Sequence, residues 1–151
     1  MSRKRVTATS PELPQPSPDL KSLNPLVGTW RISGGTKGQI RFEWMDGGFF
    51  LIQHVDLEYG GRKITGIEMI GRRHRPGEPP GPDICSRFYS FLDGLTLDYV
   101  YEFANDTLTI WYGPRGSDNC FIGKFSKDGH SFRGAWKWPS GGYEVTGTRV
   151  P

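Results

Sequence analysis

Three ionisable side chains in short alternating segments are the first candidates for chemistry. His54 lies in FFLIQHVDLEYG, Glu68 in KITGIEMIG and Arg87 in ICSRFYSF. A Glu68 that faces an apolar interior has a raised pKa and suits acid or base work, and an inward Arg87 is then its ion-pair partner. An inward His54 is a proton shuttle or a ligand anchor. The opposite strand parity places each of them on an outer surface, and the sequence leaves both orientations open.

Aromatic residues at alternating positions indicate a binding cavity. With His54, Glu68 and Arg87, the predicted lining comprises Trp44, Tyr99, Tyr101, Tyr112, Phe121, Trp136 and Tyr143. Rings with a few polar groups suit a small apolar or aromatic molecule, and buried tyrosine hydroxyls need hydrogen-bond partners. The alternative is that the rings simply fill the interior, as side chains do in small barrels.

Several classes of chemistry lack their motifs. The chain has no G-x-S-x-G, no phosphate-binding glycine loop and no H-E-x-x-H, so nucleophilic catalysis finds no support. Cys85 and Cys120 fit neither a metal spacing nor a disulfide framework, and we expect reduced thiols and no metal site. Of the net charge of +3, residues 1–21 carry +2 and the rest of the chain only +1, so the folded part lacks the clustered Lys and Arg that a nucleic-acid partner needs.

Short alternating segments separated by turn residues must position the candidate side chains. We predict ten strands, at 28–33, 38–45, 49–59, 62–70, 84–92, 96–103, 107–112, 120–126, 131–138 and 143–150. The short links favour hairpins between sequential neighbours, and a meander of this length tends to close because closure removes its exposed edges. The expected fold is all-β, an up-and-down antiparallel barrel.

The exception is the proline-rich segment Gly71–Asp83, which is longer than a hairpin loop. Its part Arg72–Asp83 is either a lid at the barrel mouth or a solvated arm. A rival function is a barrel packed by its own side chains that serves as a protein-interaction module through this segment.

The two ends of the barrel segment are predicted to meet. Tyr143, Val145 and Arg149 share one face of the last strand, so the guanidinium points at the core and needs acceptors or an aromatic face. Trp30 on the first strand is the natural partner, because closure makes the first and last strands neighbours.

The motif GTW at Gly28–Trp30, with GTRV at the end of the chain, resembles the calycin superfamily of lipocalins, fatty-acid-binding proteins and nitrobindin-type haem barrels. LVGTW followed by WMDGGFFLIQHVD is most similar to small bacterial lipocalin-like domains of unknown function. The resemblance covers about residues 24–150. It implies that Gly28, Trp30 and Arg149 close one end of the barrel structurally.

The remaining expectations concern the limits of the barrel domain, the cellular location and the oligomeric state. Residues 1–22 are predicted to be a disordered Pro/Ser-rich tail with a helical turn near Asp19–Leu23, and residues 23–151 to be the barrel. The basic start MSRKR precedes no apolar segment, so we expect no secretory signal, no membrane span and a cytoplasmic location. An exposed strand face offers a surface for a homodimer.

The favoured function is non-covalent binding of a small apolar or aromatic molecule inside the barrel, without a cofactor. One alternative is an isomerase or cyclase that uses Glu68 or His54 as acid or base. Another is haem binding of the nitrobindin type, although the last strand YEVTGTRV has no histidine and His130 lies in a turn.

Overall fold

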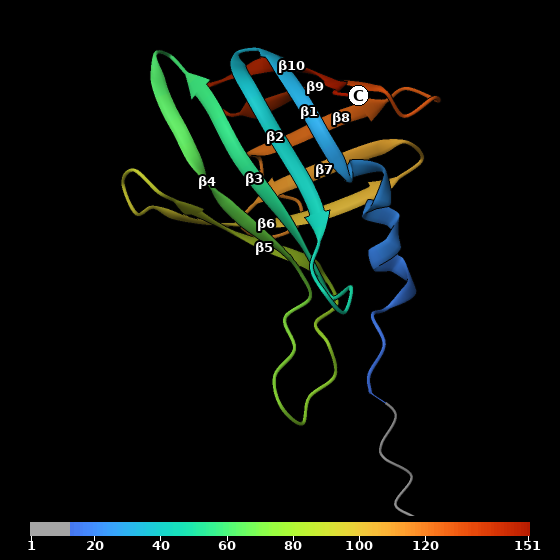
Figure 1. Cartoon of the computed structure of the whole chain (residues 1–151). Helices are drawn as coiled ribbons and strands as arrows, with labels where there is room; N and C mark the ends of the chain where they lie inside the picture. The colour runs from blue at the N-terminus through green and yellow to red at the C-terminus, as the bar shows by residue number, and fades with distance from the viewer. Residues whose placement is uncertain (1–12) are drawn as a thin grey trace, which may run out of the picture.

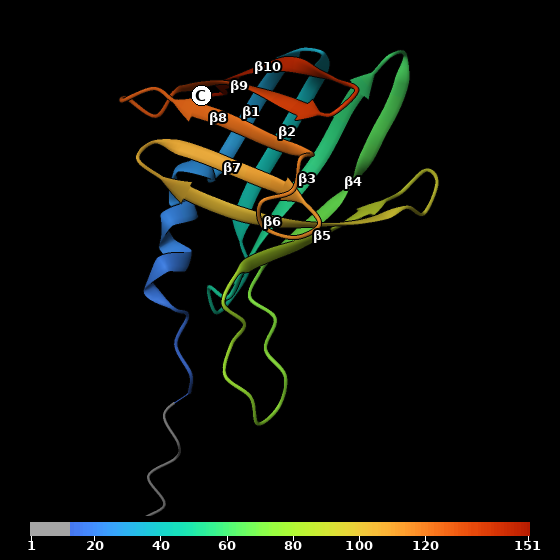
Figure 2. The same ribbon diagram turned by 180° about the vertical axis from the view of Figure 1, so that it is seen from behind.

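The computed structural model describes residues 13–151 and shows one closed antiparallel barrel of ten strands (Figures 1 and 2). Every strand pairs with its sequence neighbours, and β1 pairs with β10 to close the barrel. The strands are β1 Gly28–Gly34, β2 Thr36–Trp44, β3 Phe50–Tyr59, β4 Arg62–Gly71, β5 Ile84–Ser90, β6 Thr96–Ala104, β7 Thr107–Tyr112, β8 Cys120–Phe125, β9 Ser131–Trp138 and β10 Gly141–Arg149. The predicted fold class is therefore confirmed.

Strand limits differ from the predicted ones by a few residues. β5 ends at Ser90, two residues early, because the amide of Ser90 bonds to the carbonyl of Leu95 and that of Phe91 bonds to Thr65. These two bonds turn the chain into the hairpin that leads to β6. β2 begins at Thr36, two residues early, since only Gly35 separates it from β1.

Two tight turns set the register of their hairpins. Gly60 and Gly61 have φ values of 56° and 78° between β3 and β4, and Asn105 and Asp106 have 52° and 59° between β6 and β7. Positive φ at both central residues is the geometry that two-residue hairpin turns require, and glycine, asparagine and aspartate adopt it most readily. Gln53 is consequently paired with Glu68 across the first of these hairpins.

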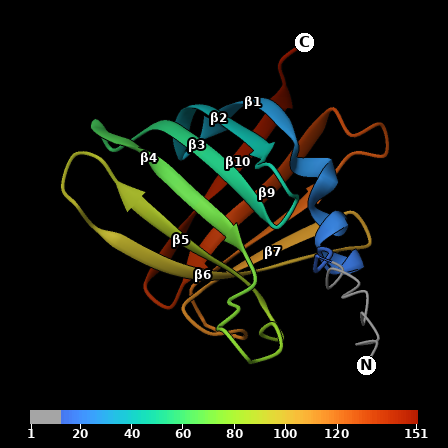
Figure 3. The same ribbon diagram turned by 60° about the horizontal axis from the view of Figure 1, so that its bottom comes forward.

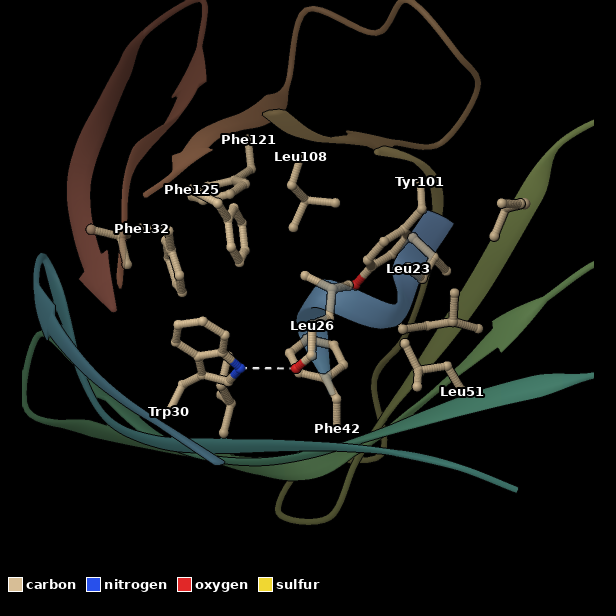
Figure 4. Packing of buried hydrophobic residues seen from close by; sticks show 14 of the residues in the cluster. Leu23, Leu26, Trp30, Phe42, Leu51, Tyr101, Leu108, Phe121, Phe125 and Phe132 are labelled. Atoms are coloured by element: carbon tan, nitrogen blue, oxygen red, sulfur yellow. Dashed lines mark hydrogen bonds between the residues drawn. The ribbon is translucent and has the colours of Figure 1, made fainter. Parts of the chain in front are cut away.

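A 3-10 helix, η1 Pro18–Leu26, covers one end of the barrel (Figures 1 and 3). Leu20, Leu23 and Leu26 of this helix are buried in the core cluster, and Figure 4 shows Leu23 and Leu26 among the core side chains. The helix extends across the expected boundary between tail and barrel at residues 22 and 23, because Leu20 also packs into the core. The part of the predicted tail at residues 1–12 lies outside the described residues.

The hairpins β1–β2, β3–β4, β5–β6 and β9–β10 and the β7–β8 connection lie at the opposite end, which we call the mouth. In Figure 1 the hairpins β3–β4 and β5–β6 extend on the left, away from η1 on the right. The long loop joins the ends of β4 and β5 that lie away from the mouth. The expectation of a lid over the mouth is therefore wrong.

Arg72 attaches this loop to η1. Its guanidinium donates to the hydroxyl of Ser17 at 3.0 Å and to the carbonyls of Gly81 and Pro82 at 2.8 and 2.7 Å, and it pairs with Asp19. The Arg72 side chain is 14% exposed, whereas that of Asp19 is 58% exposed. Charge-assisted hydrogen bonds to carbonyl oxygens should therefore contribute more than the ion pair with the exposed Asp19.

Replacing Arg72 with methionine is expected to lower the free energy of unfolding by about 1–3 kcal/mol, since it removes charge-assisted hydrogen bonds from a largely buried position. Arg73→Met is the matched control, because Arg73 is 65% exposed and only approaches Asp98 at 3.7 Å. Its expected effect is within about 0.5 kcal/mol. Urea denaturation measures the free energy of unfolding of both variants. Equal losses in the two variants would contradict the conclusion that Arg72 attaches the long loop to η1.

Cys85 and Cys120 are free thiols and are partly buried. Among residues 13–151, no helix has both the length and the apolar character needed to cross a membrane.

Candidate functional site

The closed end of the barrel is built around Trp30 and Arg149, which face each other across the β1–β10 pair. The Arg149 guanidinium carbon lies 4.3 Å from the centroid of the fully buried Trp30 ring. Arg149 also donates to the carbonyls of Gly129 at 3.1 Å, Pro25 at 2.9 Å and Val27. The inward arginine predicted from strand parity thus has both an aromatic face and acceptors.

Trp30 connects this arrangement to η1. Its indole nitrogen donates to the carbonyl of Leu26 at 2.8 Å, and the ring contacts Phe125 and Phe132 edge-on with centroids 5.5 and 5.3 Å away (Figure 4). Gly28 has a φ of 124°, and a Cβ there would collide with the Arg149 guanidinium. These residues therefore close the barrel and leave the opposite end free.

A cavity of about 420 Å³ occupies the barrel interior above this closed end. Aromatic and aliphatic side chains provide most of its wall, and the mouth opens it to solvent. Ligand cavities of single small molecules span roughly 300–1,000 Å³. The interior is therefore large enough to hold a molecule, in contrast to a barrel packed solid by its own side chains.

One carboxyl group lies in this cavity. Glu68 of β4 is 6% exposed, and the phenol of Tyr101 on β6 donates a hydrogen bond to one of its oxygens. Burial raises the pKa of Glu68 to about 7, although the bond from Tyr101 acts in the opposite direction. Burial and the nearby Glu68 also raise the pKa of Tyr101, so the phenol keeps its proton.

Two further polar side chains face the same region. Gln53 is the cross-strand partner of Glu68 on β3 and lines the cavity. Ser86 on β5 is 4% exposed and is not among the cavity-lining side chains, but it lies close enough to Glu68 to lower the pKa of that carboxyl group.

Seven of the ten predicted ligand-binding residues line the cavity. They are Glu68, Tyr99, Tyr101, Tyr112, Phe121, Trp136 and Tyr143. Tyr99 and Tyr112 have ring centroids 5.7 Å apart toward the mouth, and Trp136 contacts both Tyr99 and Phe121. Burial raises the pKa of Tyr143 to about 12, so this phenol is neutral at physiological pH.

The other three predicted residues do not line the cavity. Trp44 shares the inward face of β2 but lies near the closed end, where its indole nitrogen donates to the side chain of Asn24 at 2.7 Å. His54 is on the outer face of β3, 2.8 Å from the carboxylate of Glu43. Arg87 is on the outer face of β5 and pairs with Asp98 at 2.7 Å, so it is not the partner of Glu68.

The strand pairing explains these positions, since cross-strand partners share a face. Phe42 faces inward and pairs with Gln53, which pairs with Glu68, which in turn pairs with Phe88. The adjacent residues, including His54 and Arg87, must point outward. Sequence reasoning missed Gln53 as a lining residue, although alternation along β3 places it on the inward face once the orientation of one neighbouring residue is known.

None of the three histidines lines the cavity. His54 is on the outer wall, His74 is in the exposed long loop and His130 is in the exposed β8–β9 turn. A haem ligated by histidine inside the barrel therefore has no ligand among these side chains. Residues 13–151 also contain no group of three or more His, Cys, Asp or Glu side chains placed to hold a metal ion.

Comparisons with known proteins do not assign the chain to a family. No protein-family model matches it, and no curated protein matches it at significant similarity.

Proposed function

We propose that this protein binds a small, largely apolar molecule non-covalently inside its barrel. The observation that carries the proposal is the 420 Å³ interior cavity, lined by rings and aliphatic side chains and closed at only one end. Burial of apolar ligand surface against such a wall supplies the affinity, at roughly 25 cal/mol for each Å² removed from water. The Glu68–Tyr101 pair provides the polar contact that orients the molecule.

We also propose that the chain is a lipocalin-like barrel of the calycin type. Support comes from the stacked pair of Trp30 and Arg149 on the first and last strands, with Gly28 leaving room for the guanidinium. A closed ten-stranded meander is compatible with that class.

Filling the cavity tests the binding proposal. Val55 lines the cavity, whereas His54, its neighbour along β3, points outward. We expect Val55→Phe to weaken binding of the neutral probe 1-naphthylmethanol at least tenfold, because the added ring takes the ligand's space. His54→Phe should leave the affinity unchanged.

Isothermal titration calorimetry measures both affinities, and thermal melting verifies that both variants are folded. Equal affinities in the two variants would contradict the proposal. A native mass spectrum of the purified protein, compared with its denatured mass, adds the identity of any molecule that copurifies.

A second function is favoured by one observation, the Glu68 pKa of about 7 in a cavity. A group with this pKa exchanges a proton near neutral pH, which suits general acid–base catalysis of an isomerisation or cyclisation. The molecules recovered from the unsubstituted protein and from Glu68→Gln distinguish the two functions. A carrier yields the same molecule from both, whereas an enzyme yields product from the first and unreacted substrate from the second.

A further inference from the structure

The charge inside the cavity is of one sign. Glu68 is the only aspartate or glutamate among the described lining residues, and no lysine, arginine or histidine lines the wall. Arg149 lies at the closed end, where Trp30 and three backbone carbonyls occupy its guanidinium. Any charge that a bound molecule carries in the cavity therefore meets a carboxyl group and no cation.

The side chains around Glu68 carry no charge, and Tyr101 donates a hydrogen bond to it. On β3 the facing residue is Gln53, on β5 Ser86 and Phe88, and on β6 Tyr101. The titratable side chains that face it are Tyr101 and, nearer the mouth, Tyr99, and burial raises both of their pKa values. Both phenols are therefore neutral near pH 7, so neither compensates the Glu68 charge.

We infer that the molecule bound in this barrel carries a protonated amine on an apolar body, and that the ammonium group pairs with Glu68. The inference rests on the proposed binding function and adds the chemical class of the ligand. An ammonium group has three donors. The Glu68 carboxylate and the Gln53 amide oxygen are acceptors on this side of the cavity.

A ligand with a carboxylate or a neutral hydroxyl group forms less favourable interactions with this site than a cation does. A ligand carboxylate would place a second negative charge beside Glu68 with no cation to compensate either one. A neutral alcohol exchanges hydrogen bonds but gains no charge pairing. A cation gains the carboxylate and, in addition, the faces of the surrounding rings.

The test compares three probes that share one apolar body: 1-naphthylmethylamine, 1-naphthylmethanol and 1-naphthoate. Isothermal titration calorimetry gives their affinities for the protein at pH 8 and pH 6. We expect the amine to bind at least tenfold more tightly than the alcohol at pH 8, and the carboxylate to bind more weakly than either.

Lowering the pH to 6 should weaken amine binding about tenfold. The cation selects ionised Glu68, whose pKa is about 7, and a primary amine stays protonated at both pH values. The alcohol serves as the internal reference, because its binding requires no ionised partner.

Glu68→Gln keeps the shape of the side chain and removes its charge. It should reduce amine affinity at least tenfold at pH 8 and remove the preference over the alcohol. Glu102→Gln is the matched control, because this neighbour of Tyr101 lies on the outer wall and pairs with Arg115. The pH dependence of the unsubstituted protein supplies a second measurement that needs no variant.

The outcomes distinguish failure of the amine inference from failure of the binding proposal. Alcohol binding without a preference for the amine, or an amine preference that survives Glu68→Gln, overturns the amine inference and leaves the binding proposal standing. Failure of all three probes to bind overturns both.

Discussion

Replacing Trp30 with alanine is expected to lower the free energy of unfolding by about 3–5 kcal/mol, the range observed for large buried aromatic side chains. Trp30 is fully buried, packs against Phe125 and Phe132, and donates to the carbonyl of Leu26. Its loss opens a cavity at the closed end and removes the ring on which Arg149 stacks. Urea denaturation monitored by circular dichroism measures the change.

The matched control is Trp111→Ala. Trp111 also has an arginine over its ring, since the Arg115 guanidinium lies 4.8 Å from its centroid, but this pair is on the outer wall. A partly exposed ring leaves no internal cavity when it is removed, so the expected loss is below about 1 kcal/mol. Equal losses at the two tryptophans would contradict a special role for the closed end.

A double-mutant cycle isolates the pair at the closed end. Trp30→Ala and Arg149→Met, measured singly and together, should give a coupling energy of about 0.5–2 kcal/mol, the range for a cation over an aromatic face. A coupling of zero would mean that Arg149 acts only through its bonds to the carbonyls of Pro25, Val27 and Gly129.

The second large effect is a pH-dependent stability that Glu68 imposes. Its pKa is about 7 in the folded protein, compared with an ordinary value of 4.5. Between these values the unfolded chain releases a proton that the folded protein retains, so raising the pH through this range favours unfolding. At 1.36 kcal/mol for each unit of pKa, the loss amounts to about 3 kcal/mol.

Glu68→Gln is therefore expected to stabilise the protein by about 3 kcal/mol at pH 8 and to change little at pH 4.5. The amide preserves the shape of the side chain and accepts the hydrogen bond from Tyr101 without a buried charge. Urea denaturation at pH 4.5, 6 and 8 measures the difference between the two proteins.

Both proteins share the same exposed carboxylates, so subtracting their free energies of unfolding at each pH cancels the contributions of these groups. Asp98, for example, has a pKa lowered by its hydrogen bonds from Arg87, which makes stability fall toward acid pH in both proteins. Glu102→Gln is the control for loss of a carboxylate on the outer wall. A difference between Glu68→Gln and the original protein that does not vary with pH would refute the buried-acid interpretation.

Alternation and turn chemistry were sufficient to predict the ten strands, the meander and closure. The Gly60-Gly61 and Asn105-Asp106 turns are two residues long, so their flanking residues must pair, and Gln53 must share a face with Glu68. Local sequence also placed Arg149 inside, because the parity of the last strand is unambiguous, and closure of the barrel identified Trp30 on the first strand as its partner.

The orientations of His54, Glu68 and Arg87 depended on contacts between distant segments. β3 and β4 are apolar on both faces, so alternation alone does not show which face is inward. The connections on either side of this hairpin, at Met45–Phe49 and Arg72–Asp83, are too long for their lengths to define the pairing. The faces were assigned only when β3 paired with β2 and β5 paired with β4, which placed Glu68 inside and left His54 and Arg87 in solvent.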